Sequence, residues 1–302
     1  MSGLVFETTR GHGSDSSTPT IAFASPVDAA DLPRSKAPFL LMAAALTGTV
    51  LSVVIGIVLN APVVAIGGGA AGLLAGIVLL VVGLKRIVDR GLATFTADLD
   101  RAGIRHAPNL DRETAKALFP QVAHLEKWLK YGSRGLKSYG ETTVATDRGD
   151  LAVRLFYHRY TVSTGNSHHV VQHWIALAPP QESGHPWPEL TLSNENFVAR
   201  IAKKLGREDH ELDDTSFNDR WLVRCDDPDF PLVALPPVVQ SVLADSPRYE
   251  TWVFGPRGVA VLHVGVHKSQ AVVGLAHRVA RVRAMMPTVL DAGWTPNVAT
   301  PK

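Results

Sequence analysis

Two apolar runs near the start of the chain constrain its fold more than any other feature. The first extends from Phe39 to Leu59 and the second from Pro62 to Leu84, with only Asn60 and Ala61 between them. Neither run contains a charged residue, and at ~1.5 Å of rise per residue a helix of this length spans ~30 Å, the thickness of a hydrocarbon core. A helix on the surface of a soluble domain needs a polar face, which both runs lack. The sequence therefore predicts a transmembrane helical hairpin over residues 38–85.

Charged residues beside the two runs predict the orientation of this hairpin. Arg34 and Lys36 precede the first run, Lys85 and Arg86 follow the second, and the turn between the runs is uncharged. Positive flanks stay on the cytoplasmic side, so we expect a multi-pass protein of the inner or plasma membrane with both termini in the cytoplasm. The lone Cys225 agrees with a reducing compartment, because one cysteine cannot form an internal disulfide.

Small residues recur at every fourth position of both runs and line one face of each predicted helix. In lipid, such a stripe lets two helix backbones approach closely. Two uses remain open, which are packing within the hairpin and oligomerisation. The predicted helix-packing residues are Ala44, Gly48, Ser52, Gly56, Gly68, Gly72 and Gly76. Three glycines here match a dinucleotide fingerprint only in their letters, since the strand and acidic residue that it requires are missing. No cofactor is predicted.

The rest of the chain is long enough for a core of its own. The protein has 302 residues, 46% of them hydrophobic, and a formal net charge of +2, which is too small to indicate nucleic-acid binding. Residues 1–37 combine glycine, serine and proline without periodicity, and this pattern predicts a disordered cytoplasmic tail. We divide the remainder into a stalk and helical linker over 86–131 and a cytoplasmic domain over 132–302.

Helical periodicity follows the second apolar run. It predicts that the membrane helix continues as a stalk to about Arg105, and that a second helix extends from Asp111, a suitable N-cap, to about Tyr131. Pro120 should kink this second helix. Its apolar stripe consists of Leu118, Val122, Leu125 and Leu129.

Beyond Gly132 the pattern favours strands that pair with their neighbours in sequence. Alternation over Leu151–His158, with turn residues at Asp147–Asp150 and at Gly165–Asn166, predicts a three-stranded meander that ends in a strand over Val170–Leu177. Further elements follow: an extended piece at 190–192, a helix at 194–205, a strand at 221–225, a helix at 231–243, a hairpin of 251–254 with 259–266, and a helix at 269–286. We predict an α+β fold whose antiparallel sheet is covered by helices on one face.

One stretch of this domain resembles a known family. The segments Phe217–Val223, Asp226–Phe230 and Leu235–Val238 are similar to the central motif of an uncharacterised family of bacterial two-helix membrane proteins, in which a strand opening with Phe-Asn is followed by an acidic turn and a helix. The resemblance implies a hairpin anchor followed by a cytoplasmic domain. It implies no activity, because the role of the family is itself unassigned.

Candidate reactive residues each have a structural alternative. Asp226, Asp227 and Asp229 offer clustered carboxylates to a divalent cation, but at a strand-to-helix junction we favour a capping role. The histidines of the predicted hairpin suggest zinc, a pH-sensing cluster or an ordinary polar strand face, and we favour the last. They are His158, His168, His169 and His173, with His185 in the loop that follows.

The lone cysteine and the final helix also have two interpretations each. Cys225 alternates with Trp221 and Val223, which predicts a buried thiol rather than a nucleophile. The final helix carries Arg278, Arg281 and Arg283 opposite an apolar stripe. This pattern indicates either a core-packing helix with a solvated basic face, which we favour, or a helix that lies on anionic headgroups.

The sequence thus predicts a membrane-anchored interaction or scaffold protein, with the lipid bilayer and either a protein partner or a second copy as its binding partners. No catalytic, cofactor-binding or metal-binding residue is predicted. The alternative is a membrane-associated, metal-dependent hydrolase that uses Asp226, Asp227 and nearby histidines.

Overall fold

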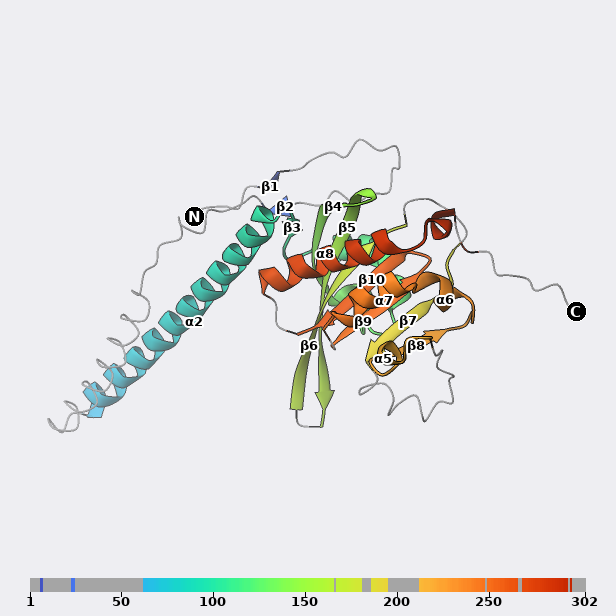
Figure 1. Cartoon of the computed structure of the whole chain (residues 1–302). Coiled ribbons are helices and arrows are strands. Elements are labelled where there is room, and N and C mark those ends of the chain that lie inside the picture. The colour runs from blue at the N-terminus through green and yellow to red at the C-terminus, as the bar shows by residue number, and fades with distance from the viewer. Residues whose placement is uncertain are drawn as a thin grey trace, which may run out of the picture. The chain divides into compact units, whose positions relative to one another are not determined.

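The computed structural model describes residues 6–7, 23–24, 62–165, 167–180, 186–194, 212–247, 249–265, 268–292 and 294. The chain divides into two compact units, one of residues 26–98 and one that combines residues 1–25 with 99–302. Figure 1 shows the elements of both units.

The unit of residues 26–98 contains most of the long helix α2, Pro62–Arg101. This helix joins the second apolar run to the predicted stalk without interruption, so the predicted helical continuation is confirmed. It ends at Arg101 rather than at Arg105, because the chain reverses at Gly103, whose φ of +74° favours glycine. Six apolar side chains of α2 are between 40% and 66% exposed, namely Leu74, Ile77, Val78, Val81, Val82 and Val88.

Among the residues that the structure describes, no helix is long and apolar enough to cross a membrane. The first predicted membrane run, Phe39–Leu59, lies outside these residues, and with it Ala44, Gly48, Ser52 and Gly56. Gly68, Gly72 and Gly76 belong to α2, but their surroundings also lie outside the described part of the chain. The small-residue packing therefore stays a prediction.

The second unit is built on an eight-stranded antiparallel sheet in the order β3-β4-β5-β6-β10-β9-β7-β8. The predicted meander and the later hairpin are both confirmed. The turn residues Asp147-Arg148, Gly165 and Pro256-Arg257 lie between consecutive strands. The strands are β3 Arg105–Ala107, β4 Leu136–Thr146, β5 Gly149–Thr164, β6 Ser167–Ala178, β7 Leu190–Asn194, β8 Trp221–Cys225, β9 Glu250–Gly255 and β10 Gly258–Val264.

A separate two-residue ladder pairs β1, Phe6–Glu7, with β2, Phe23–Ala24. The remaining residues of the predicted tail, 1–37, lie outside the described part of the chain.

Helices cover both faces of the eight-stranded sheet, so the prediction that they cover only one face is wrong. On one face, Leu118, Val122, Leu125 and Leu129 form a single buried cluster with strand residues such as Phe156. On the other face lies α8, Ser269–Met285, which crosses the strands in Figure 1 and buries the apolar stripe predicted for it. Two-sided coverage explains why both Leu155 and Phe156 are buried although they point to opposite faces.

Prolines shorten two of the predicted helices. Asp111 caps α3, Arg112–Leu118, as predicted, because its carboxylate accepts hydrogen bonds from the backbone N–H groups of Glu113 and Thr114 at 2.9 Å. The predicted extension to Tyr131 is wrong, since Pro120 lacks an N–H donor and 3₁₀ turns replace the α-helix at 119–121 and 123–125. A further 3₁₀ turn at 132–135 leads into β4.

The predicted helix over 231–243 is likewise two helices, α6 Phe230–Ala234 and α7 Pro237–Ala244. Leu235 precedes Pro236 and is held away from the α-helical region. The predicted helix over 194–205 lies outside the described residues except for Asn194, which ends β7. In the motif that carries the resemblance, Phe217 and Asn218 end a short helix, α5 Thr215–Asn218, and do not open the strand.

Candidate functional site

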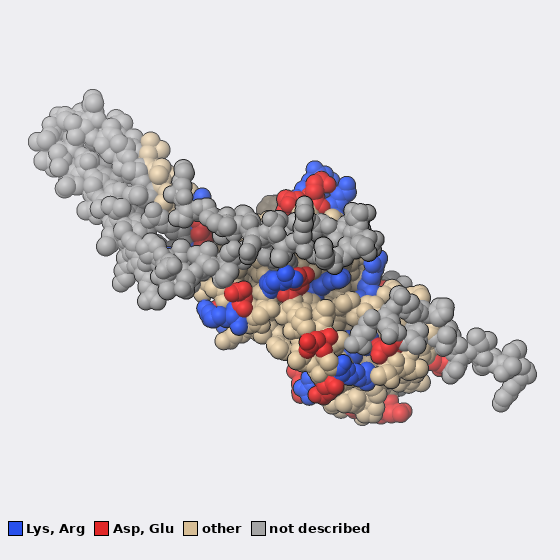
Figure 2. Space-filling view, turned by 90° about the horizontal axis from the view of Figure 1, so that it is seen from above, with Lys and Arg blue, Asp and Glu red and all other residues tan. Residues whose placement is uncertain are grey.

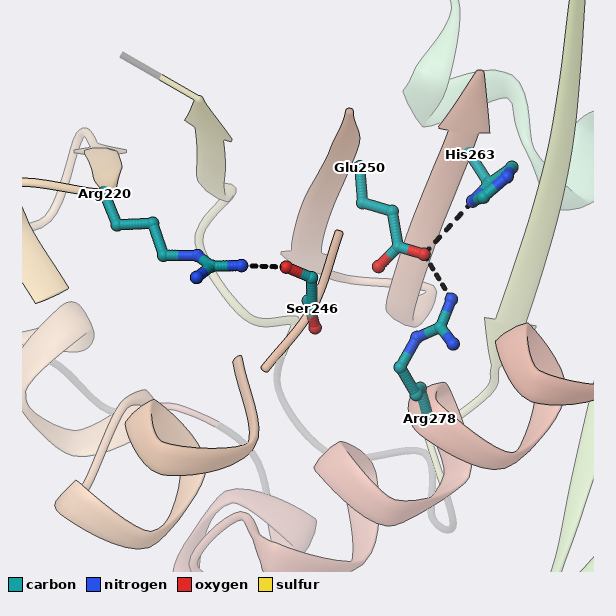
Figure 3. A network of polar contacts seen from close by, with 5 residues as sticks. All are labelled: Arg220, Ser246, Glu250, His263 and Arg278. Carbon is teal, nitrogen blue, oxygen red and sulfur yellow. Dashed lines mark hydrogen bonds and ion pairs between the residues drawn. The ribbon is translucent and has the colours of Figure 1, made fainter. Parts of the chain in front are cut away.

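A buried carboxylate with two basic partners joins the sheet to the helix α8. The Glu250 side chain is 0% exposed, and its Oε1 atom accepts from Nδ1 of His263 at 3.2 Å and from the guanidinium of Arg278. Figure 3 shows the imidazole and the guanidinium converging on this one oxygen. The other oxygen, Oε2, is buried without a hydrogen-bond partner.

The fold explains how these three residues meet. Glu250 begins β9 and stands directly opposite His263 of β10, so their side chains share one face of the sheet. Arg278 lies on α8, the helix that covers this face, and reaches down to the carboxylate. The ring of Tyr249 packs edge-on against His263, with 4.8 Å between the ring centroids. The cluster therefore connects two strands and a helix.

A carboxylate that accepts from Nδ1 of an imidazole is also the arrangement that orients a catalytic base. Such a base needs a hydroxyl, a thiol or a metal-bound water at Nε2 to act upon. The contacts described for His263 are with Glu250 and with the ring of Tyr249. These contacts make the cluster a structural link between α8 and the sheet.

A second polar contact lies beside this cluster. The guanidinium of Arg220 donates to the backbone carbonyl of Ser246, as Figure 3 shows. Arg220 immediately precedes β8, while Ser246 follows α7 and lies just before β9. The contact therefore fastens the turn that leads to β9 against the start of β8.

The basic face predicted for the last helix is not a solvated face. Arg278 is committed to Glu250, and Arg283, only 1% exposed, forms an ion pair with Asp291 and stacks over the ring of Trp187. Only Arg281 of the three is exposed. The predicted core-packing helix is confirmed, because its apolar stripe is buried, whereas the predicted solvated basic face holds only for Arg281. Neither partner carboxylate can be identified from the helix sequence.

The acidic cluster at the end of β8 caps the helix that follows it. The Oδ1 atom of Asp227 accepts from the backbone N–H groups of Asp229 and Phe230, and its Oδ2 atom accepts from Nε1 of Trp294 at 2.7 Å. Asp227 thus serves as the predicted cap, whereas Asp229 makes no side-chain cap bond. Within the residues that the structure describes, no group of three His, Cys, Asp or Glu side chains is placed to hold a metal ion.

The histidines predicted on the hairpin do not approach this acidic cluster. Strands β10, β9 and β7 lie between β6 and β8, which separates His173 from Asp227 by roughly 19 Å at ~4.8 Å per strand. His185 lies outside the described residues. Within the described residues, the geometry does not bring Asp227 together with the histidines of the hairpin.

The strand register settles how the hairpin histidines face one another. His158 stands directly opposite His173, and both are buried, whereas His168 and His169 lie near the exposed tip. Nε2 of His158 lies 3.1 Å from the carbonyl of Gly132, and both ring nitrogens of His173 are buried without a partner. Burial lowers the pKa of His158 and lowers that of His173 to about 4. The predicted polar strand face is thus correct only for the tip.

Stability is expected to fall as the pH falls from 6.5 to about 4. Burial lowers the pKa of His106, His124 and His173 from 6.5 to about 4, so these imidazoles stay neutral in the folded chain while the unfolded chain takes up protons. A pKa that is lower by one in the folded chain than in the unfolded chain corresponds to about 1.4 kcal/mol, so the summed loss of stability should reach several kcal/mol. Urea unfolding across this pH range measures it. His173→Phe should reduce the slope, and equal stability at both ends of the range would contradict the expectation.

Cys225 is half-buried at the end of β8, beside the fully buried Val223. Burial raises the pKa of its thiol to about 11, which keeps it protonated and unreactive at neutral pH. The prediction of a structural rather than nucleophilic cysteine therefore fits its surroundings, although the side chain is less buried than its alternation suggested.

Comparisons with known proteins find no matching family model, no matching curated protein and no matching solved structure.

Proposed function

We propose that this protein is a membrane-anchored binding protein whose α+β domain offers a β-ribbon to a protein partner. The anchor is the hairpin predicted over residues 38–85, from which both termini face the cytoplasm. Two observations support this anchor: both apolar runs lack charged residues, and α2 exposes apolar side chains. Exposed apolar stripes of this kind are typical of surfaces that contact lipid or another helix.

The observation that carries the binding role is the length of β5 and β6. The pairing of β4 with β5 ends at His158, and the pairing of β10 with β6 ends at His173. Residues 159–164 and 167–172 continue as a two-stranded ribbon that projects from the sheet in Figure 1. Within the described residues, no strand pairs with either outer edge of this ribbon.

The composition of the ribbon favours the addition of a further strand. Its two arms contain β-branched residues at 161, 162, 164, 170 and 171, a single charged residue, Arg159, where the ribbon leaves the sheet, and no proline. Proline and charged residues are those with which proteins protect exposed edges from pairing. A partner segment could therefore bind by main-chain hydrogen bonds along either edge. The segment could come from another protein or from a second copy of this chain.

Topology and binding can be tested separately. In a Cys225→Ser background, a cysteine placed at Ala61 should react with a membrane-impermeant reagent added outside intact cells, and cysteines at Ser2 or Pro301 should not. External labelling at either terminus would refute the proposed anchor orientation.

The ribbon is tested by a photo-crosslinking residue at position 161 of the full chain in its native membrane. We expect discrete adducts that disappear when Val162→Lys and Val170→Lys place charges on the ribbon. Val238→Lys serves as the control, because Val238 is 48% exposed on α7 and Val170 is 46% exposed. Adducts that persist in the ribbon variant, or that the control also removes, would refute the ribbon as the binding site.

A further inference from the structure

A short basic segment connects the 3₁₀ turns that follow α3 to β4. Residues 127–140 contain four basic residues and no acidic one. Lys127 is paired with Glu189, while Lys130, Arg134 and Lys137 are exposed. Lys137 donates through Nζ to the carbonyl of Arg134 at 2.8 Å, which keeps these two residues together. These three basic residues flank Tyr131 within seven positions of the sequence, and we call the four residues the Tyr131 platform.

Tyr131 has a backbone conformation that a bulky residue rarely adopts. Its φ is +66°, in the left-handed region, and its side chain is 64% exposed. Such a conformation costs free energy and persists only where the surroundings enforce it. The Tyr131 hydroxyl lies 3.5 Å from the carbonyl of Thr161, and its ring meets that of Tyr160 edge-on at 6.1 Å. The aromatic side chain is therefore held at the surface by β5.

The turn below the platform is locked by a buried histidine. His158 lies 3.1 Å from the carbonyl of Gly132, and its ring occupies the space where a side chain at position 135 would stand. A Cβ added to Gly135 would lie 2.1 Å from Nε2 of His158. Close packing on this side leaves the turn little freedom, so the platform is preorganised.

Other basic residues in this unit have different surroundings. Arg278 forms an ion pair with the buried Glu250, and Arg283 forms one with the partly buried Asp291. On the face seen from above in Figure 2, positive and negative side chains are interspersed and no patch of one sign stands out. The Tyr131 platform differs, because its three basic residues are exposed and lie near an exposed aromatic residue in the sequence.

We infer that the Tyr131 platform docks on the anionic lipid headgroups of the membrane in which the protein is anchored. This inference rests on the proposed anchor. Lysine and arginine pair with phosphate and carboxylate headgroups, and tyrosine places an apolar ring with a polar tip at the membrane interface. Because an anchored domain is already concentrated at the surface, a few weak contacts suffice to fix its orientation. The platform would thereby set the direction in which the β5–β6 ribbon points.

The test uses the full chain with Cys225→Ser and an environment-sensitive fluorophore on Ser133→Cys. The protein is placed in nanodiscs of phosphatidylcholine alone, or of equal parts phosphatidylcholine and phosphatidylserine. We expect protection from a water-soluble quencher only in the discs with phosphatidylserine, and loss of that protection at high salt. Replacing Lys130, Arg134 and Lys137 with glutamine should weaken docking on the order of 100-fold. Tyr131→Ala should weaken it, and Tyr131→Phe should restore most of it.

A matched control replaces three other exposed basic residues, Arg257, Lys268 and Arg281, with glutamine. Equal protection in both lipids, or loss of protection in this control, would overturn the inference. So would protection of the label by polyglutamate in phosphatidylcholine discs, which would indicate an acidic protein partner. Failure of the chain to enter discs of either composition would instead refute the proposed anchor, so the two failures are distinguishable.

Discussion

Gly258→Ala is expected to destabilise the protein by about 3 to 5 kcal/mol, enough to unfold many domains. Gly258 follows the turn between β9 and β10 with a φ of +105°, a conformation that L side chains rarely adopt. A Cβ at this position would lie 2.1 Å from the carbonyl oxygen of Ala178, which is backbone and cannot move aside cheaply. The substitution therefore adds backbone strain to a steric clash at the junction of three strands. Urea unfolding followed by tryptophan fluorescence measures the loss.

Gly255 at the other end of the same turn provides the control. Its φ lies outside the glycine-favouring region, and a Cβ there would meet nothing within 4 Å. Gly255→Ala should be neutral or stabilising by about 0.4 to 1 kcal/mol, because alanine reduces the entropy of the unfolded chain. Equal destabilisation by both substitutions would show that the turn tolerates no side chain at all, and that the contact with Ala178 is not the cause.

Arg278→Met is the second substitution with a large expected effect, about 3 to 5 kcal/mol. It leaves the fully buried carboxylate of Glu250 with one hydrogen-bond donor, His263, although Oε2 already has none. An uncompensated buried charge is the costly outcome, rather than the loss of a favourable pair. Thermal and urea unfolding of the purified full chain would measure it. Arg281→Met, on the exposed side of the same helix, should change stability by no more than about 0.5 kcal/mol.

A double variant tests whether the unpaired carboxylate of Glu250 causes the loss of stability in Arg278→Met. If the cost arises from the unpaired carboxylate, Glu250→Leu combined with Arg278→Met should recover more than half of the loss, since apolar replacements of buried ion pairs are often tolerated. Additive losses in the double variant would mean instead that each side chain is needed for its own packing. That result would refute the ion-pair explanation.

Buried and partly buried polar contacts also hold the segment after α8 on the domain. Arg283 pairs with Asp291, Nε1 of Trp187 donates to the carbonyl of Leu290 at 2.8 Å, and Trp294 donates to Asp227. Each bond joins a residue near the end of the chain to a helix or loop that precedes it. Buried polar groups of this kind specify one arrangement, because an alternative docking would leave them unsatisfied.

Much of the secondary structure follows from local sequence alone. The alternation in β5, the turn residues before and after it, the cap at Asp111 and the apolar stripe of α8 each depend on neighbours within a few positions. Those signals act through backbone conformation and solvent exposure, which the local sequence controls. The prediction of two membrane helices is of the same kind, since it needs only length and the absence of charge.

Other features depend on residues that the sequence does not connect. Only the tertiary structure placed β10 between β6 and β9, set His158 opposite His173, and paired Arg278 with Glu250. Strand order and register depend on which distant surfaces become buried together. Both faces of the sheet became covered because α3 and the segment after it bury four leucine and valine residues that the sequence could assign only to one continuous helix. Sequence thus determined the meander, the turns between its strands and the position of α8, and it predicts the anchor, while long-range burial decided which side chains meet.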